Sequence, residues 1–238
     1  MHSKSKLRIF VIILSTLIIS LGIYFAPKIE RKLAIKEVTE TNKKVLENFK
    51  TSEENKQKLL KVQFICQAPL RTEGNWEFHE ESCEEAALLQ AYDYETGNTI
   101  TREQANEKIL NMIDWQKDFF GSHKDLYDED MKSFATNYLY LQDEQFVIMK
   151  NATLKDIKDQ IDKNHPVIVG VTSQYLENPY YPHPGYHMLT VIGYTEEFII
   201  TNDNGTCRGK SFAYGFDKFE KAMQDAGSSI YIINLGNI

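Results

Sequence analysis

The first residue whose type and position suggest chemistry is a cysteine at the start of an apolar segment. Cys83 lies in Ser82-Cys83-Glu84-Glu85, directly before AALLQAY. Ser82 and Glu85 have the spacing of a capping box, which would place Cys83 at the first position of a helix. The unpaired amides and the positive dipole end of a helix stabilise a thiolate there. The nearby glutamates oppose this because like charge disfavours a thiolate, so a nucleophile and a buried core cysteine both remain open.

A histidine and an aspartate form the second candidate pair. Residues 187–194 (HMLTVIGY) and 197–202 (EFIITN) have the composition of two strands joined by a short turn. This hairpin would place His187 opposite Asp203 or Asn204, where an imidazole can hydrogen-bond a carboxylate. Such a bond orients the ring and stabilises its charged form, as a general base requires. The alternative is a strand-end histidine beside a turn-forming Asn-Asp-Asn-Gly sequence.

Gln67 is the third candidate. It lies in the segment FICQAP, sixteen positions before Cys83. A glutamine amide beside a nucleophile can donate a hydrogen bond to a developing oxyanion. A single glutamine is equally compatible with an exposed loop, so Gln67 indicates a catalytic role only together with Cys83 and His187.

Two pairs of residues have a spacing that could serve a metal ion. His79 and Cys83 are four positions apart, and so are His183 and His187. Zinc accepts both ligand types. A Pro-Gly sequence interrupts the second pair, which therefore cannot be the helical pair that this spacing usually supplies. We therefore expect neither a metal nor another cofactor, and a zinc site remains the less favoured alternative.

Taken in chain order, these residues resemble the papain-like cysteine peptidases of the bacteriocin-processing type, the peptidase C-39-like family. Gln67 is followed by a tryptophan, then by Cys83 in CEEAALLQAY, then by HMLTVIGY and ITNDNGT. The resemblance covers residues 62–238. It implies Cys83 as the nucleophile, His187 as the general base and acid, and Asp203 as the residue that orients the imidazole. It also implies that Gln67 and the Cys83 amide bind the oxyanion of a peptide substrate.

Some positions depart from the pattern of that family. Glu84 and Glu85 follow the cysteine where many members have glycine and then proline, and Asn204 follows Asp203 where proline is usual. Asn202 is an alternative third member of the triad. Transporter-linked members cleave double-glycine leaders, but no transporter segment is recognised here, so their substrate does not carry over. The alternative function is a degenerate peptidase fold that binds peptide or cell-envelope partners, with the glutamates keeping the thiol protonated.

The chain has three cysteines, too few for a disulfide scaffold. Cys66 is adjacent to Gln67, and Cys207 closely follows Asp203. We therefore consider a disulfide between Cys66 and Cys207 beside the site, in a compartment outside the cell.

The periodicity of the sequence changes halfway along the expected domain. Helical spacing comes first, and short segments rich in β-branched and aromatic residues follow. Helices followed by an antiparallel sheet make an α+β fold, and the resemblance implies its papain-like form. The Pro-rich segment 178–186 would either border the substrate cleft or form a rigid surface connection. The expected helices are 82–94, 101–113, about 128–140, 153–163 and 216–226, and the expected strands are 165–171, 187–194, 197–202 and 229–235.

The N-terminal part of the chain resembles a membrane anchor. The uncharged run 9–26 would span about 27 Å as a helix, close to the thickness of a hydrocarbon core. We expect a short basic tail at 1–8, a single transmembrane helix at 9–26, a charged, partly helical stalk at 27–61 and one folded domain at 62–238. The alternative for the apolar run is a cleaved secretory signal. In both cases the domain lies outside the cytosol, and its expected partners are a peptide substrate and the lipid bilayer.

Composition excludes other classes of protein. The 238 residues are 42% hydrophobic and 26% charged, which is typical of a globular chain and excludes disorder throughout and a multi-pass membrane protein. The formal net charge is -7, and because the first 36 residues carry seven basic groups and one acidic group, the remainder is more acidic still. An acidic domain is a poor partner for phosphate backbones, so nucleic-acid binding is not expected.

Overall fold

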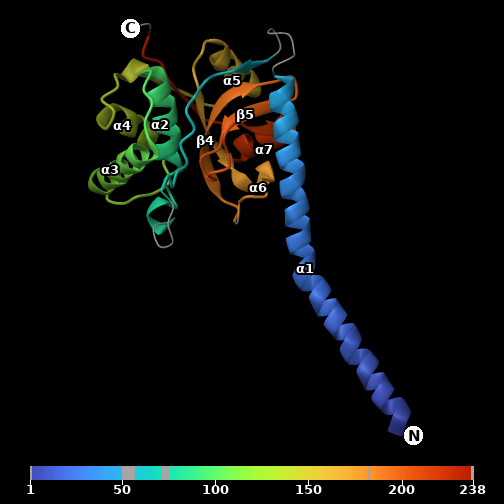
Figure 1. The fold of residues 1–238 in the computed structure, drawn as a ribbon. Coiled ribbons are helices and arrows are strands. Elements are labelled where there is room, and N and C mark those ends of the chain that lie inside the picture. Colours follow the sequence, from blue (N-terminus) through green and yellow to red (C-terminus); the bar gives the residue numbers. More distant parts are fainter. Residues whose placement is uncertain (1, 50–56, 71–75, 182, 237–238) are drawn as a thin grey trace.

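The computed structural model describes residues 2–49, 57–70, 76–181 and 183–236, except for the side chains of residues 2–22, 76 and 77. Helices and strands alternate irregularly along the chain (Figure 1). The helices are α1 (His2–Asn48), α2 (Cys83–Glu95), α3 (Arg102–Phe120), α4 (Asp128–Asn137), α5 (Leu154–Asp162), α6 (Ser173–Leu176) and α7 (Phe216–Asp225), with 3₁₀ turns η2 (Trp76–His79) and η3 (Asp143–Gln145). The strands are β1 (Lys58–Leu59), β2 (Phe146–Met149), β3 (Val167–Thr172), β4 (Tyr186–Tyr194), β5 (Phe198–Asn202), β6 (Phe212–Gly215) and β7 (Ile230–Ile233).

The strands form one antiparallel sheet. Its order is β2-β7-β3-β4-β5-β6, and β1 pairs with β4. Both faces of the central strands are buried: Val169 and Leu189 belong to one hydrophobic cluster, whereas their neighbours Ile168 and Met188 belong to another. Because side chains alternate along a strand, two layers of helices are needed to cover such a sheet.

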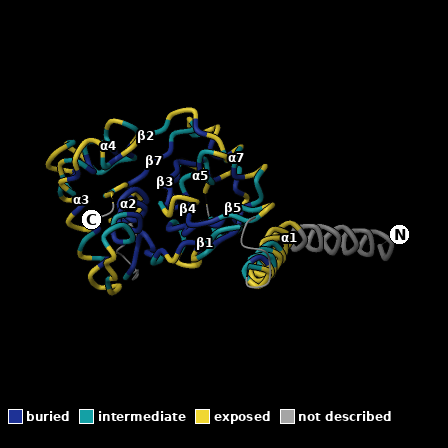
Figure 2. The backbone as a smooth tube through the Cα atoms, turned by 90° about the horizontal axis from the view of Figure 1, so that it is seen from above, coloured by how far each residue is buried: buried dark blue, intermediate teal, exposed yellow. Residues whose placement is uncertain are grey.

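The helices supply these two layers. Ala87 and Leu88 of α2 join the cluster that contains Ile168, while Ile157 of α5 and Phe219 of α7 join the other. Figure 2 shows α2 on one side of β3 and β4 and α5 and α7 on the other, with the buried backbone between them. The α+β class with an antiparallel sheet is therefore confirmed.

The observed boundaries of some helices and strands differ from the predicted ones because contacts between distant segments determine where these elements begin and end. Helix α3 continues beyond residue 113 to Phe120, with Gln116 buried on the added turn, and Gly121, with a φ of 81°, follows its last residue. Strands β1, β2 and β6 were not predicted. They have two to four residues each, too few to show a periodicity of their own.

The charged segment after residue 27 is more than a solvated stalk. The second half of α1 lies along the domain (Figure 1), where Val45 is buried in a hydrophobic cluster against which Val38 and Phe49 pack. Asn42 Oδ1 also accepts a hydrogen bond of 2.9 Å from the backbone amide of Ala213 in β6. Part of the segment expected as a stalk therefore packs on the domain through Val38, Asn42 and Val45.

The expected membrane anchor falls mostly outside the residues with described side chains. Among the residues that were described, no helix is both long and apolar enough to cross a bilayer. The anchor at 9–26 stays a prediction from the sequence.

Candidate active site

Cys83 is the first residue of α2, as the sequence predicts, but the capping box is absent. The side chain of Ser82 makes no capping hydrogen bond. Glu85 is fully buried and accepts a hydrogen bond of 2.6 Å from Gln116 Nε2 of α3, with His123 Nε2 at 3.1 Å. The prediction of a capping box was wrong because these tertiary partners hold Glu85 away from the end of its own helix.

The thiol of Cys83 points to the carboxylate next to it in sequence. Cys83 Sγ donates to Glu84 Oε2 over 3.1 Å, and the Leu126 amide donates to Glu84 Oε1 over 3.1 Å. Burial, followed by the carboxylate of Glu84, raises the pKa of the Cys83 thiol well above its ordinary value. Burial and the neighbouring Glu85 also raise the pKa of Glu84. In this arrangement the cysteine is a protonated thiol rather than a thiolate.

His187 lies on β4 and contacts Asp203, which follows β5. His187 Nε2 is 3.0 Å from Asp203 Oδ1. The hairpin has a longer turn than predicted and a bulge between Val191 and Gly193, so its register is shifted. The predicted neighbourhood of imidazole and carboxylate is nevertheless present, because Asp203 reaches the ring from beyond the end of its strand.

The carboxylate of Asp203 is fully buried and accepts several further hydrogen bonds. Tyr181 Oη donates to its Oδ1, and Tyr214 Oη donates to its Oδ2. Asn178 Nδ2 donates to Oδ2 over 3.1 Å. Burial alone would raise the pKa of Asp203, but the bond from His187 and those from the two tyrosines outweigh it, so the pKa is lowered. The site thus holds an ionised carboxylate against the imidazole.

Tyr181 and Asn178 belong to the Pro-rich segment 178–186, for which the sequence left two roles open. The ring of Tyr181 lies edge-on to the ring of His187, with their centroids 5.4 Å apart. This part of the segment packs against the histidine and aspartate and is therefore more than a surface connection.

Cys83 and His187 are neighbours across the contact between α2 and β4. The amide of Met188, which follows His187, donates to Cys83 Sγ over 3.3 Å. The two described side chains are not hydrogen-bonded to each other, because the thiol donates to Glu84 instead. Both side chains are nearly inaccessible, with 4% of Cys83 and 5% of His187 exposed. A substrate can reach them only if neighbouring side chains move.

Gln67 is close to this group, but its amide is already engaged. Gln67 Nε2 donates to the carbonyl oxygens of His79 and Glu80, over 2.8 and 3.0 Å. Its backbone amide donates to the carbonyl of Asn204, whose side chain in turn donates to the carbonyl of Cys83. Gln67 is thereby tied to the first turn of α2, without a free amide hydrogen pointing to an oxyanion.

Other residues at the site were assigned differently or missed. Asn202, the alternative third member of the triad, accepts a bond from the Ser211 amide and donates to the Val62 carbonyl. It therefore joins segments of backbone, and Asp203 is the residue on the imidazole. The roles of Asn178, Asn204 and Tyr214 were missed. Their positions depend on how β6 and the loops fold back on the hairpin, which no local sequence signal shows.

The metal-binding alternative finds no support in the pairs that suggested it. Within the described part of the chain, the group whose ligand atoms lie close enough to share an ion is Cys83, Glu84 and Asp125, which contains no histidine. His187 is occupied by Asp203.

The hypothesis of a disulfide is confirmed. Cys66 and Cys207 are bonded to each other, and Cys83 is the free cysteine of the chain. The bond joins the strand-like segment before Gln67 to the loop that follows Asp203, so it lies beside the candidate site.

Comparison with known proteins gives the class of protein that this fold and site define. The profile of the Peptidase_C39 like family matches residues 59–230, and the chain belongs to this family. The fold is similar to that of a crystal structure described as a C39-like peptidase from Bacillus anthracis, with a TM-score of 0.55 and 16% sequence identity over 77% of this chain and 100% of that one. No curated protein matches the sequence. The resemblance to C39-like peptidases noted from the sequence is thus confirmed.

Proposed function

We propose that this protein is a cysteine peptidase that hydrolyses peptide bonds with Cys83, His187 and Asp203. The observation that carries the proposal is the bond from His187 to a buried, ionised Asp203, directly beside a cysteine at the start of a helix. A carboxylate held in this way fixes the orientation of an imidazole and stabilises its charged form. Membership of a peptidase family supports the same reaction.

The reaction would begin with the thiol turning from Glu84 to His187. Because His187 Nε2 is bound to Asp203, its Nδ1 is the atom that would take the thiol proton. Cys83 Sγ would then attack the substrate carbonyl, and His187 would pass the proton to the leaving amine. Water would release the acyl group from the thioester and restore the thiol. The Cys83 amide would donate to the oxyanion, and Gln67 would join it after releasing its present carbonyl partners.

Labelling with a mixture of peptidyl vinyl sulfones tests this role. We expect one adduct per chain, located on Cys83 by mass mapping, because the other two cysteines form a disulfide. His187→Ala should abolish labelling of the folded chain. Equal labelling of wild type, His187→Ala and urea-unfolded protein would show that the histidine does not activate the thiol.

A second candidate function is a catalytically inactive module that binds peptides. The observation that favours it is the contact of Glu84 with the buried thiol, which raises the pKa of Cys83. Such a module would bind peptides with the same affinity in wild type and His187→Ala while cleaving none. The rate of iodoacetamide alkylation as a function of pH separates the two: an unreactive thiol that is insensitive to His187→Ala favours the binding module.

We also propose that the domain works outside the cytosol, held there by the apolar segment 9–26. The disulfide supports the compartment, since such bonds persist in oxidising environments. The apolar run in the sequence supports the anchor. Alkaline carbonate extraction of membranes tests it: an anchored chain stays with the lipid, whereas release into the supernatant would contradict the anchor.

A further inference from the structure

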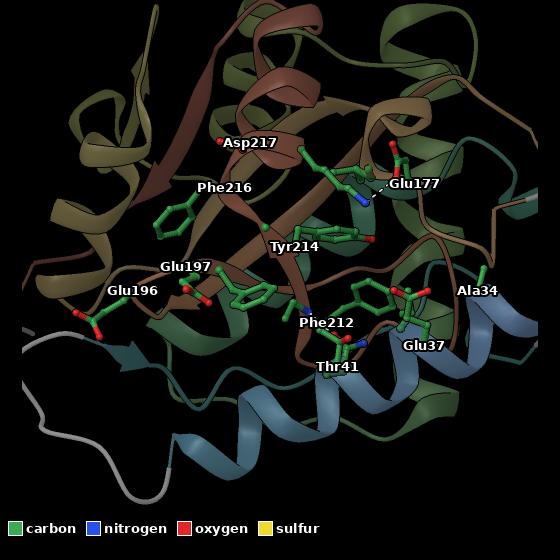
Figure 3. Close-up of a pocket in the computed structure, with 17 residues that line it drawn as sticks. Ala34, Glu37, Thr41, Glu177, Glu196, Glu197, Phe212, Tyr214, Phe216 and Asp217 are labelled. Atoms are coloured by element: carbon green, nitrogen blue, oxygen red, sulfur yellow. Dashed lines mark hydrogen bonds and ion pairs between the residues drawn. The ribbon is translucent and has the colours of Figure 1, made fainter.

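A cavity of about 690 Å³ lies between α1 and the edge of the sheet. One wall is formed by residues 34–42 of α1, and the other by β6, the start of α7 and the turn before β5 (Figure 3). This volume lies within the range of about 300–1,000 Å³ that is typical of ligand sites.

The interior of the cavity is aromatic. Phe198, Phe212, Tyr214 and Phe216 line it; Phe198 and Phe216 are half-buried, whereas Phe212 and Tyr214 are almost fully buried and tilted against each other, with centroids 4.7 Å apart. Figure 3 shows Phe212 beside the helix α1, with Tyr214 and Phe216 farther from it. Aromatic faces bind both apolar side chains and cations. Lys158 already uses the ring of Phe216 in this way, with its Nζ 3.9 Å from the ring centroid.

The rim of the cavity is acidic. Of the described residues that line it, one is basic, Lys218, and its Nζ is 2.6 Å from Glu177 Oε2. An excess of exposed carboxylates around an aromatic interior attracts cationic groups and repels anionic ones. The acidic residues of the rim are Glu37, Glu177, Glu196, Glu197 and Asp217, all of them exposed.

The cavity also contains the backbone edge of β6, which is the last strand of the sheet. Asn42 occupies the amide of Ala213. In an antiparallel strand, the amide two positions further points to the same edge, which directs that of Gly215 towards the cavity. A Cβ atom added at Gly215 would meet no atom within 4 Å, so space is open on the face of the strand beside this amide. A backbone amide beside open space suits a polypeptide, which carries carbonyl acceptors, better than a free metal cation.

From these features we infer that the cavity binds a polypeptide segment in which lysine or arginine side chains alternate with apolar ones. The apolar side chains would contact the aromatic lining, the cationic ones would meet the acidic rim, and one backbone carbonyl of the segment would accept a hydrogen bond from the Gly215 amide, since Asn42 already occupies that of Ala213. The site is separate from Cys83 but adjoins the candidate active site, because Tyr214 lines the cavity and donates to Asp203.

Fluorescence anisotropy of labelled peptides tests this site without any turnover. The full-length chain with Cys83→Ala would be titrated against fluorescein-Lys-Phe-Lys-Phe-Lys and against the matching glutamate peptide. We expect saturable binding of the lysine peptide and binding at least about tenfold weaker for the glutamate peptide, since the rim repels it. Because binding is measured in the cysteine variant, the result does not depend on the proposed peptidase activity.

Two variants of the cavity and a matched control locate the binding. The combination Glu37→Gln, Glu197→Gln and Asp217→Asn, and separately Gly215→Trp, which fills the space without changing charge, should each weaken binding of the lysine peptide about tenfold or more. The control removes three exposed carboxylates elsewhere, in the combination Glu107→Gln, Asp118→Asn and Glu144→Gln.

The inference would be overturned in any of three ways. The control could weaken binding as much as the rim combination, which would indicate general charge attraction. Gly215→Trp could leave the affinity for the lysine peptide unchanged, in a variant whose unfolding temperature equals that of wild type and which is therefore correctly folded. The wild-type cavity could also bind both peptides equally or bind neither saturably.

Discussion

At the scale of single residues, the candidate nucleophile is held in a protonated and shielded state. Cys83 has 4% of its surface exposed and donates to Glu84, while the imidazole beside it is oriented by Asp203. The proposed nucleophile and the carboxylate that accepts its hydrogen bond thus both lie in the first turn of α2. After burial, the carboxylate of Glu84 is the largest cause that raises the pKa of the thiol.

Replacing Glu84 by glutamine is expected to activate the thiol. The carboxylate is, after burial, the main cause that raises the pKa of Cys83, and an amide oxygen can still accept the bond from the Leu126 amide. The midpoint of the pH dependence of iodoacetamide alkylation should move down by about one unit or more. Glu129→Gln, an exposed position on α4, is the matched control. An unchanged or higher midpoint in Glu84→Gln would show that Glu84 does not control the thiol.

Removing the hydroxyl of Tyr214 is expected to destabilise the fold through Asp203. The Tyr214→Phe variant leaves a buried carboxylate with one donor fewer, at a cost of about 1.5–3 kcal/mol at pH 7. The pKa of Asp203 is lowered in the folded chain, so its ionised form stabilises the fold above the unfolded pKa of about 4. This contribution is lost as the pH falls through the folded value, and the difference between variant and wild type should shrink with it.

Urea unfolding at several pH values measures this effect of Tyr214. Tyr140→Phe serves as the control, since Tyr140 is 82% exposed. A loss of stability in Tyr214→Phe that is the same at pH 3 and pH 7 would contradict the role of the ionised carboxylate.

At the scale of elements, the hairpin of β4 and β5 and the start of α2 bring the site together. The hairpin could be predicted because both strands are rich in β-branched residues and are joined by a short turn, which brings His187 near Asp203. The hydrogen bond of Glu85 could not be predicted. The local capping rule pairs Glu85 with the start of its own helix, whereas its partner in the structure is Gln116 on α3, 31 positions away. The position of Tyr214 could not either, since it depends on β6, a strand of four residues.

Helix α1 is expected to stabilise the sheet through the edge of β6. Asn42→Ala would leave the amide of Ala213 without its side-chain partner and should lower the free energy of unfolding by about 1–2 kcal/mol. Urea unfolding followed by tryptophan fluorescence measures this loss. Glu40→Ala, an exposed position on the same helix, should change stability much less. Equal effects of the two substitutions would mean that α1 does not stabilise the domain through this bond.

At the scale of the whole molecule, the disulfide joins the two parts of the chain that carry the site. Cys66 and Cys207 are 141 positions apart, and between them lie α2 and the β4–β5 hairpin. The fold class and the order of the candidate residues were predictable from the sequence. The closed state of the site was not, because it results from buried contacts between distant segments.

Loss of this disulfide is expected to destabilise the domain. The double variant Cys66→Ala and Cys207→Ala should lose about 2–5 kcal/mol of unfolding free energy, since the unfolded chain is no longer constrained by a long loop. Urea unfolding of the double variant and of the oxidised wild type measures the difference. Reduced wild type should behave like the double variant, and equal stability of all three proteins would contradict the prediction.

The most direct test of the central claim is hydrolysis of a degenerate peptide library, read by mass spectrometry. The proposed mechanism predicts new peptide termini with the wild type and none with Cys83→Ala or His187→Ala, while Asp203→Asn should retain at most about one hundredth of the wild-type rate. Cleavage that persists in Cys83→Ala would contradict the mechanism. So would a wild-type chain that binds library peptides and leaves every one of them intact.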